Sequence, residues 1–357
     1  MYAARNICRQ MMNKIPDTFL TETLTRSDKP IVLYGMGNGA DRIIDTLAQH
    51  GCGIDGVFVS DGFVRDKTFH GHKLCSYSDM CARYDDFIVL VSFGTSLPDV
   101  MDRIIEISHE RELYAPYVPV TGDGDFTREY FESRLHDYEK VYRVLADDLS
   151  RRTFEDIISY RITGRTDFLT DCETDTDELY RILSLGDNEV YADYGAYRGD
   201  TIAEFLGHVS SYRRIYAAEP DIRTFRKLGE YAGDLPDCVL YNAAAYSHSD
   251  GTGFAQRGGR SSSVSDKSAF IPTVCTDDLE ISPTYIKMDI EGAESEAIIG
   301  SRRTISYIHP KLRISAYHRM NDLLDIPEQV LGIYGGYRLY LRHRPYFPDW
   351  DTEFIFV

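Results

Sequence analysis

The chain has 357 residues, 43% of them hydrophobic and 27% charged, with a formal net charge of −18 at pH 7. This length predicts two globular domains, and the acidic balance excludes a general attraction to nucleic acid or to an anionic membrane. Residues 1–20 lack a signal-peptide core, and no apolar run approaches the ~18 residues of a membrane span. Seven scattered cysteines without a CxxC pair argue against a disulfide framework or a structural zinc site. We therefore expect a soluble cytoplasmic protein.

Residues 1–120 are predicted to form a Rossmann-like domain. Strands alternate with helical patterns here, which indicates a parallel sheet, and IVLYGMGNGADRII reads as strand, glycine loop and helix. No acid stands at the mouth of this loop, so a phosphate is compatible with it. The domain is similar to N-terminal domains of sugar-modifying enzymes, and we expect it to hold a sugar nucleotide or to act as a scaffold. The candidate nucleotide-binding residues are Gly35, Gly37, Gly39 and Asp61.

Residues 121–185 are predicted to be a helical connector. From Leu135 to Arg161, apolar and aromatic residues recur at helical spacing, while charged residues fill the opposite face. We expect this helical layer to pack on one or both sheets.

Residues 186–357 are predicted to form a second α/β domain, so the fold class is α/β with two Rossmann-like domains. Its strand candidates, in chain order, are EVYADYG, RIYAAEP, CVLYNAAAY, TYIKMDI, LRISAYH, YRLYLRH and TEFIFV. Helical patterns separate the first five, which indicates parallel pairing, whereas the last two should form an antiparallel hairpin. This is the layout of a class I methyltransferase sheet. The long Gly- and Ser-rich segment before the fourth strand, with Arg260 and residues 261–263, is expected to be a flap near an acceptor pocket.

An acid stands at the start of the second glycine loop, in the stretch YADYGAYRGD. There Asp193 would repel the pyrophosphate of a dinucleotide, but it would attract the sulfonium and ammonium groups of S-adenosylmethionine, which has no phosphate. Glu219 ends the next strand and could accept both ribose hydroxyl protons. The predicted cofactor-binding residues are Asp193, Gly195, Ala196, Tyr197, Gly199, Glu219, Pro220, Asn242, Ala243 and Asp289.

The stretch IKMDIEGAE carries most of the candidate catalytic groups. Asp289 ends a strand, Lys287 shares its face, and Glu291 follows in the loop, while His318 follows the neighbouring strand. Methyl transfer to a hydroxyl is an in-line displacement in which the hydroxyl proton must leave. Three alternatives stay open: metal-free base catalysis by Asp289, Glu291 or His318, a divalent cation such as Mg²⁺ held at Asp289, and catalysis by positioning alone.

The chain from about Arg143 to its C-terminus resembles the FkbM family of S-adenosylmethionine-dependent methyltransferases. The motifs that carry the resemblance are VYADYGAYRGDT, IYAAEPD, TDDL, IKMDIEGAESEAIIG and AYH followed by DLLDIPEQV. Tyr194 departs from the family, which usually has Val there. The resemblance implies a Rossmann-like fold and methylation of a hydroxyl oxygen, often on a sugar or a polyketide.

The expected function is therefore O-methylation of a carbohydrate or glycan precursor in polysaccharide biosynthesis. Aromatic faces suit sugar stacking, and the chain has 26 tyrosines and one tryptophan, Trp350. One alternative is an NAD(P)-dependent sugar-nucleotide oxidoreductase or epimerase run by the N-terminal domain. The other is a non-catalytic sugar-nucleotide-binding protein.

Overall fold

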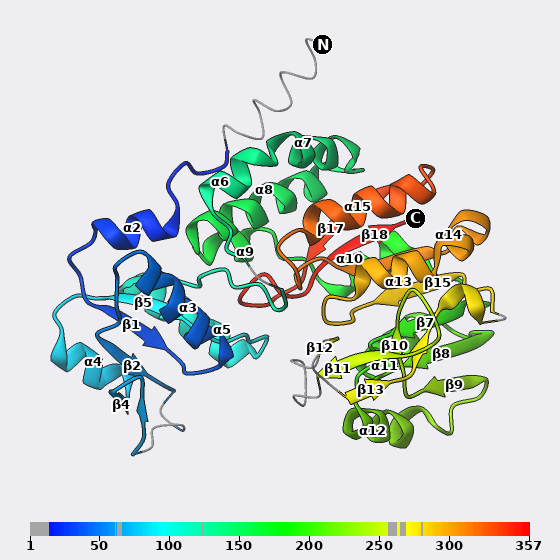
Figure 1. Cartoon of the computed structure of the whole chain (residues 1–357), viewed down its shortest axis with the longest axis horizontal. Helices are drawn as coiled ribbons and strands as arrows, with labels where there is room; N and C mark the ends of the chain where they lie inside the picture. The colour runs from blue at the N-terminus through cyan, green and yellow to red at the C-terminus, as the bar shows by residue number, and fades with distance from the viewer. Residues whose placement is uncertain are drawn as a thin grey trace, which may run out of the picture.

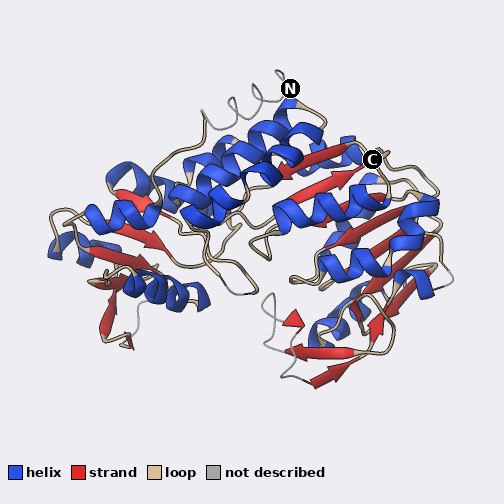
Figure 2. Cartoon of the chain, turned by 45° about the horizontal axis from the view of Figure 1, so that its top comes forward, coloured by secondary structure: helices blue, strands red, loops and turns tan. Residues whose placement is uncertain are grey.

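The computed structural model describes residues 14–60, 62, 66–122, 124–255, 263–264, 269–279 and 281–357. Two large sheets lie at opposite ends of the molecule, and a layer of helices lies between them (Figures 1 and 2). This arrangement follows the predicted order of an N-terminal α/β unit, a helical connector and a C-terminal α/β unit.

The N-terminal sheet has the strand order β3-β4-β2-β1-β5-β6 and is parallel except for the β3–β4 pair. The neighbouring strands β1 and β5 consist of apolar and aromatic residues that are buried on both faces, as a parallel sheet covered by helices requires. Its elements are α2 (Leu20–Arg26), β1 (Ile31–Tyr34), α3 (Asn38–Gln49), β2 (Gly56–Phe58), β3 (Thr68–Phe69), β4 (His72–Cys75), α4 (Tyr77–Arg83), β5 (Ile88–Val91), α5 (Pro98–Glu110) and β6 (Glu112–Tyr114).

The connector is helical, as the periodicity predicts. Its helices are α6 (Arg128–Ser133), α7 (Leu135–Val144), α8 (Asp148–Thr163), α9 (Asp167–Asp171) and α10 (Thr176–Leu183). The Asp147 side chain caps the start of α8, and Gly164 ends it in the left-handed conformation. Arg342 of the C-terminal sheet donates to Asp147 at 2.7 Å and to Ser150 at 2.8 Å, so α8 covers the edge of that sheet.

The C-terminal sheet has the strand order β17-β18-β16-β15-β7-β8-β9. Its first five strands in chain order are parallel, while β18 is antiparallel to both β16 and β17, which confirms the predicted hairpin. The link 344–351 between β17 and β18 is too short for a crossover helix. The elements are β7 (Val190–Tyr194), α11 (Asp200–His208), β8 (Arg214–Ala218), α12 (Ile222–Ala232), β9 (Cys238–Tyr241), β15 (Tyr285–Met288), α13 (Glu294–Gly300), α14 (Arg302–Ile308), β16 (Lys311–Ser315), α15 (Asp322–Ile333), β17 (Leu339–His343) and β18 (Thr352–Phe356).

Two small sheets between β9 and β15 were not predicted from the sequence. One pairs β10 (Ala244–Ala245) with β14 (Thr273–Val274), and the other joins β11 (Thr252–Ala255) to β12 (Ser263–Val264) and β13 (Ala269–Ile271). Arg260 and residues 261 and 262 of the predicted flap lie outside the described residues. None of the helices in the described part of the chain combines the length and apolar character that a membrane crossing requires.

Candidate active site

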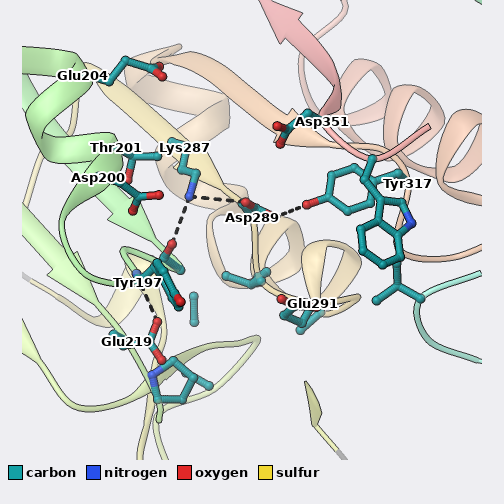
Figure 3. Close-up of a pocket in the computed structure, with 18 of the residues that line it drawn as sticks. Tyr197, Asp200, Thr201, Glu204, Glu219, Lys287, Asp289, Glu291, Tyr317 and Asp351 are labelled. Carbon is teal, nitrogen blue, oxygen red and sulfur yellow. Dashed lines mark hydrogen bonds and ion pairs between the residues drawn. The ribbon is translucent and has the colours of Figure 1, made fainter. Parts of the chain in front are cut away.

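A pocket opens at the carboxyl edge of the C-terminal sheet, where the strand order reverses between β7 and β15 (Figure 3). Open α/β sheets bind their ligands at such a switch point. The pocket is lined by Val120, Gly195, Tyr197, Asp200, Thr201, Glu204, Glu219, Pro220, Ala244, Ala245, Lys287, Asp289, Ile290, Glu291, Ala293, Tyr317, Arg344, Tyr346, Trp350 and Asp351.

The glycine loop after β7 passes directly across the end of β15. Gly195 has φ +81°, and a Cβ atom there would lie 1.8 Å from the Asp289 carbonyl oxygen. Gly199, with φ +91°, faces Tyr231, whose ring would lie 2.4 Å from an added Cβ. Both glycines are therefore required by the packing of the loop, and the loop brings the Gly195 and Tyr197 positions to the pocket.

Glu219 lies at the end of β8, as the sequence predicts, and its carboxylate reaches the pocket. It accepts hydrogen bonds from the backbone N–H groups of Tyr197, at 3.1 Å, and Asp221, at 2.8 Å. Burial raises the pKa of this carboxyl group to about 7, although the two backbone donors oppose the shift. In its ionised form, Glu219 has lone pairs left to accept the two hydroxyl protons of a ribose.

The structure does not bring the Asp193 side chain to the pocket, in contrast to the expectation from the sequence. This side chain is 0% exposed and does not line the pocket, because it points beneath the glycine loop. Lys287 is its direct neighbour across the β7–β15 pair, with Nζ 3.5 Å from Oδ1, and Thr201 donates to Oδ2 at 2.5 Å. Burial raises the pKa of Asp193 despite these two partners. A carboxylate paired in this way holds the loop and the strand together and presents no unbalanced charge to a ligand.

The attraction for a cation comes instead from the pocket as a whole. The described lining residues include the six acids Asp200, Glu204, Glu219, Asp289, Glu291 and Asp351, against the two bases Lys287 and Arg344. Asp200 is the first residue of α11, the position where the N-terminus of a helix would otherwise receive a phosphate. Arg344 pairs with Glu204 at 3.0 Å and with Asp351 at 3.5 Å. Asp200 and Glu219 are therefore the acids of the polar end that favour a positively charged ligand over a pyrophosphate.

Asp289 stands at the centre of the pocket (Figure 3). Its carboxylate lies 3.8 Å from the Lys287 ammonium and accepts a hydrogen bond of 3.0 Å from the Tyr317 hydroxyl. Burial favours the neutral acid, but Lys287 and His318 outweigh it and lower the pKa of Asp289 well below its ordinary value. Asp289 is thus a carboxylate that can accept a hydrogen bond but binds a proton weakly.

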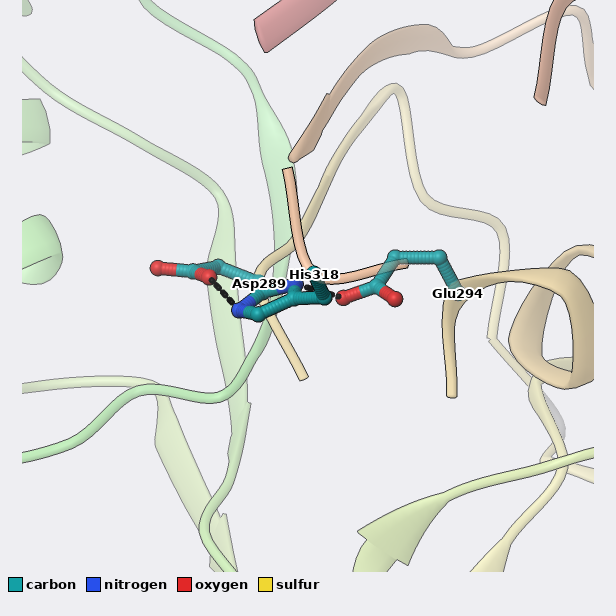
Figure 4. A group of neighbouring side chains, drawn as sticks. All are labelled: Asp289, Glu294 and His318. Carbon is teal, nitrogen blue, oxygen red and sulfur yellow. Dashed lines mark ion pairs between the residues drawn. The ribbon is translucent and has the colours of Figure 1, made fainter. Parts of the chain in front are cut away.

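His318 lies behind the pocket, with its ring between carboxylates (Figure 4). Nδ1 lies 2.9 Å from Glu294, while Nε2 lies 3.5 Å from Asp289 and 3.7 Å from Glu291. Burial lowers the pKa of His318, but the three acids, Glu294 foremost, raise it to about 10. The geometry and this pKa favour a protonated ring that is ion-paired with its carboxylate neighbours, so the arrangement disfavours His318 as a base.

The cluster of Asp289, Glu294 and His318 offers three ligand-type atoms within 4.8 Å of one another. Mg²⁺ prefers oxygen ligands, and the imidazolium already balances part of the acidic charge. The magnesium ion at Asp289 stays a prediction.

Aromatic side chains line the part of the pocket beyond Asp289. Trp350 stacks on Tyr317 with 6.5 Å between ring centroids, and it lies 5.6 Å from the Tyr346 ring. In Figure 3, Asp289 stands between this aromatic side and the side that carries Tyr197 and Glu219. The pocket therefore has two ends, one polar and acidic and one aromatic, that meet at Asp289.

The predicted residues divide into two groups. Gly195, Tyr197, Glu219, Pro220, Lys287, Asp289 and Glu291 line the pocket, whereas Asp193, Ala196, Gly199, Asn242, Ala243 and His318 support it from behind. The Asn242 amide, for example, donates to the Glu219 and Pro220 carbonyl oxygens at 2.8 and 3.1 Å.

Several residues that line the pocket, and one that pairs with His318, were not predicted from the sequence. They are Asp200, Thr201, Glu204, Tyr317, Arg344, Tyr346 and Asp351 in the lining, and Glu294 beside His318. Position at a strand end or a helix start could have pointed to Asp200 and Tyr317. The contribution of the 344–351 link depends on how β18 inserts beside β16, which no local pattern encodes.

In the glycine loop of the N-terminal sheet, close packing by itself accounts for two of the glycines. Gly35 has φ +105°, and an added Cβ would lie 2.5 Å from the Phe93 ring, while one at Gly39 would lie 3.1 Å from the Ser92 carbonyl oxygen. Gly37 is the N-cap residue of α3, and Asp61 lies outside the described residues. The second nucleotide site stays a prediction.

Comparisons with known proteins agree with this geometry. Residues 193–351 match the family model described as the methyltransferase FkbM domain. The crystal structure of methyltransferase FkbM from Methylobacillus flagellatus KT matches with a TM-score of 0.71 and 23% identity, over 100% of this chain and 97% of that chain. At this identity the likeness establishes the fold, and it includes the N-terminal domain.

Two further structures match with lower scores. One is a precorrin-6y C5,15-methyltransferase from Geobacter metallireducens GS-15, with a TM-score of 0.34 and 16% identity over 50% of this chain and 84% of that chain. The other is an rRNA methylase from Streptococcus thermophilus, with a TM-score of 0.33 and 12% identity over 50% of this chain and 90% of that chain. Scores this low carry no argument. No curated protein matches the sequence.

Proposed function

We propose that this methyltransferase, whose residues 193–351 form a methyltransferase FkbM domain, transfers the methyl group of S-adenosylmethionine to a hydroxyl of a carbohydrate or glycan precursor. The polar end of the pocket fits the cofactor. Glu219 is placed for the ribose, the loop at Gly195 and Tyr197 borders the same space, and the excess of acids favours the sulfonium and the ammonium group.

The aromatic end supports a carbohydrate acceptor. Sugar rings present C–H faces that pack on aromatic rings, and their hydroxyls bond to carboxylates. Tyr317, Tyr346 and Trp350 supply the rings, while Asp289 and Asp351 supply the carboxylates. The observation that carries the proposal is that Asp289 lies where the two ends of the pocket meet. An acceptor hydroxyl that is hydrogen-bonded to Asp289 would therefore lie beside the cofactor end.

The chain's own residues then perform two tasks. Bound S-adenosylmethionine would supply a methyl group that its sulfonium makes electrophilic. Asp289 orients the acceptor oxygen toward that methyl group by accepting its hydroxyl proton in a hydrogen bond, while Tyr317 and Lys287 keep the carboxylate in place. Methyl transfer would make the proton of the acceptor hydroxyl strongly acidic, and Asp289, to which that hydroxyl is bonded, is the group that would accept it.

A methyl-transfer assay tests this proposal. The full chain is incubated with S-adenosylmethionine labelled at the methyl group and with glycan, RNA and protein fractions of a cell extract. The proposal expects label in the glycan fraction as an O-methyl group, and the Asp234→Asn variant, altered in an exposed loop, should transfer it normally. Label confined to the RNA or protein fraction would contradict the proposal.

An NAD(P)-dependent reaction at the N-terminal domain remains the alternative from the sequence. The contacts of Gly35 with Phe93 and Ser92 give this loop a packing role, and no contact among the described residues points to a nucleotide there. Calorimetry separates the two functions, because the methyltransferase proposal expects the full chain to bind S-adenosylmethionine, whereas the alternative expects it to bind NAD⁺ or NADP⁺ and not S-adenosylmethionine.

A further inference from the structure

We propose that the N-terminal domain forms one wall of the acceptor end of the pocket and fixes the position of Trp350 through Gly94. The inference rests on the proposed function and deepens it, because it assigns the N-terminal domain a role in acceptor binding. It concerns the contact between the loop after β5 and the link 344–351.

The two domains exchange backbone hydrogen bonds at this contact. The Thr95 N–H donates to the Phe347 carbonyl at 2.7 Å, and the Phe347 N–H donates to the Thr95 carbonyl at 3.0 Å. A reciprocal pair of this kind places the two segments as an antiparallel strand pair does. The link 344–351 carries Tyr346, Trp350 and Asp351, so the N-terminal domain is bonded to the segment that supplies the aromatic end of the pocket.

Gly94 makes this contact sterically specific. A Cβ atom at Gly94 would lie 2.4 Å from Cζ3 and 2.7 Å from Cε3 of the Trp350 indole. Gly94 is not among the glycines with a positive φ, so its backbone conformation does not require glycine. The indole itself requires it, because any side chain at this position would push Trp350 toward the pocket or away from its neighbours.

A displacement of Trp350 would reach the reacting atoms. Trp350 stacks on Tyr317, and the Tyr317 hydroxyl donates to Asp289. The lining residues at the cofactor end, such as Gly195, Tyr197 and Glu219, come instead from the loops after β7 and β8. The contact should therefore affect the acceptor and leave the cofactor unaffected.

A second contact supports the same role. Val120, at the end of the N-terminal domain, lines the pocket, and the Thr121 N–H donates to the His318 carbonyl at 2.9 Å. Arg161 of α8 completes the support, because its buried guanidinium pairs with Asp349 at 2.8 Å and donates to the Ala316 carbonyl at 3.3 Å. The loops that carry Tyr317 and Trp350 are thus held from the connector and from the N-terminal domain together.

The test compares Gly94→Ala with Gly53→Ala in the full chain. Gly53 lies in the same domain, is exposed, and has no atom within 4 Å of an added Cβ, so it is the matched control. The readouts are S-adenosylmethionine affinity by calorimetry, the amount of glycan extract that gives half-maximal methyl transfer, and tryptophan fluorescence. Trp350 is the only tryptophan of the chain, so the tryptophan emission reports on the surroundings of this residue.

For Gly94→Ala we expect a shifted emission maximum, an unchanged cofactor affinity, and about a tenfold or greater rise in the half-saturating amount of extract, since misplacement by ~1 Å can cost up to 100-fold. Retained cofactor affinity also shows that the variant folds. Gly53→Ala should match the parent chain in all three readouts. If Gly94→Ala also equals the parent chain in all three readouts, the inference is wrong.

A Gly94→Ala/Trp350→Phe double variant covers the case in which the single variant does not fold. The smaller ring leaves room for the added methyl group, so the double variant should fold and behave as Trp350→Phe alone does. Equal losses from Gly94→Ala with and without the tryptophan would overturn the inference. If the parent chain methylates no glycan, the proposed function fails, and the fluorescence of Gly94→Ala still decides whether the contact exists.

Discussion

The two glycine loops of this chain have the same backbone frame and different surroundings. The Gly35 N–H donates to the Phe58 carbonyl, and the Gly195 N–H donates to the Ala218 carbonyl, in each case at the end of the neighbouring strand. The N–H groups of Ser92 and Asp289, each the first residue after the strand on the other side, donate to Tyr34 and Tyr194 in the same way. The two loops are structural counterparts.

The side chains around the two loops separate them. Ser92 is buried and its hydroxyl donates to the Tyr34 carbonyl, and the Phe93 ring packs where a Cβ of residue 35 would lie. Asp289, the counterpart of Ser92, lines a pocket with five other acids. A glycine fingerprint therefore reports close backbone packing, and the groups at the neighbouring strand ends decide whether the loop serves a ligand.

The largest effect is expected from Gly195→Ala. The added methyl group would lie 1.8 Å from the Asp289 carbonyl oxygen at a φ of +81°, so the loop must move away from β15. S-adenosylmethionine affinity should fall by about 100-fold or more, since the loop borders the cofactor end of the pocket. Calorimetry measures the loss, and circular dichroism checks that the fold is retained. Cofactor affinity within a few-fold of the parent chain would show that the loop is not part of the site.

Asp289→Asn should lower kcat by about 100-fold, because the amide cannot take the hydroxyl proton, with little change in cofactor affinity. The measurement is the rate of labelled methyl transfer at saturating cofactor. Ser92→Ala, at the counterpart position, should leave kcat unchanged. A parent-like rate in Asp289→Asn would remove the central residue of the mechanism.

Cofactor binding should weaken below neutral pH by about tenfold per pH unit. Burial raises the pKa of Glu219 to about 7, and only the ionised carboxylate accepts both ribose hydroxyl protons. The affinity for S-adenosylmethionine is therefore highest above pH 7, where Glu219 is ionised, and it falls as the pH decreases through 7. Calorimetry at pH 6, 7 and 8 measures the slope, and Glu219→Gln should flatten it. A slope that survives in Glu219→Gln would assign the pH dependence to another group.

Glu294→Gln should lower the pKa of His318 from about 10, because Glu294 is the acid that raises it most. Loss of the ion pair at 2.9 Å loosens the ring behind Asp289, and we expect kcat to fall by less than the Asp289 variant does. Nuclear magnetic resonance titration of the imidazole reports the pKa directly. An unshifted imidazole titration would mean that Glu294 does not position His318.

The smallest effect on activity is expected from Gly35→Ala. The clash with Phe93 at a φ of +105° should destabilise the N-terminal domain by about 1–3 kcal/mol, measured by denaturant unfolding. Cofactor affinity should stay that of the parent chain. If S-adenosylmethionine affinity fell as far as in Gly195→Ala, the contrast between the two loops would disappear.

The sequence predicts the fold well, because strand burial, strand spacing and the short 344–351 link are local features. Glu219, Asp289 and Lys287 line the pocket together, as expected from the sequence, since the ends of parallel strands lie at one edge of a sheet. The sequence alone does not place the Asp193 side chain beneath the loop, because only the register of β7 against β15 reveals that Lys287 lies directly opposite. Glu294, Tyr346 and the Gly94–Trp350 contact depend on segments far apart in the chain, which local patterns do not bring together.

The proposed mechanism requires the acid-lined pocket after β7 to select a cationic, phosphate-free cofactor. The direct measurement is a pair of calorimetric titrations of the full chain, one with S-adenosylmethionine and one with NAD⁺ in its presence. We predict saturable binding of S-adenosylmethionine at one site, lost in Gly195→Ala and untouched by NAD⁺. Displacement of S-adenosylmethionine by NAD⁺ would contradict the account, because a pyrophosphate would then occupy the space that Asp200 and Glu219 face.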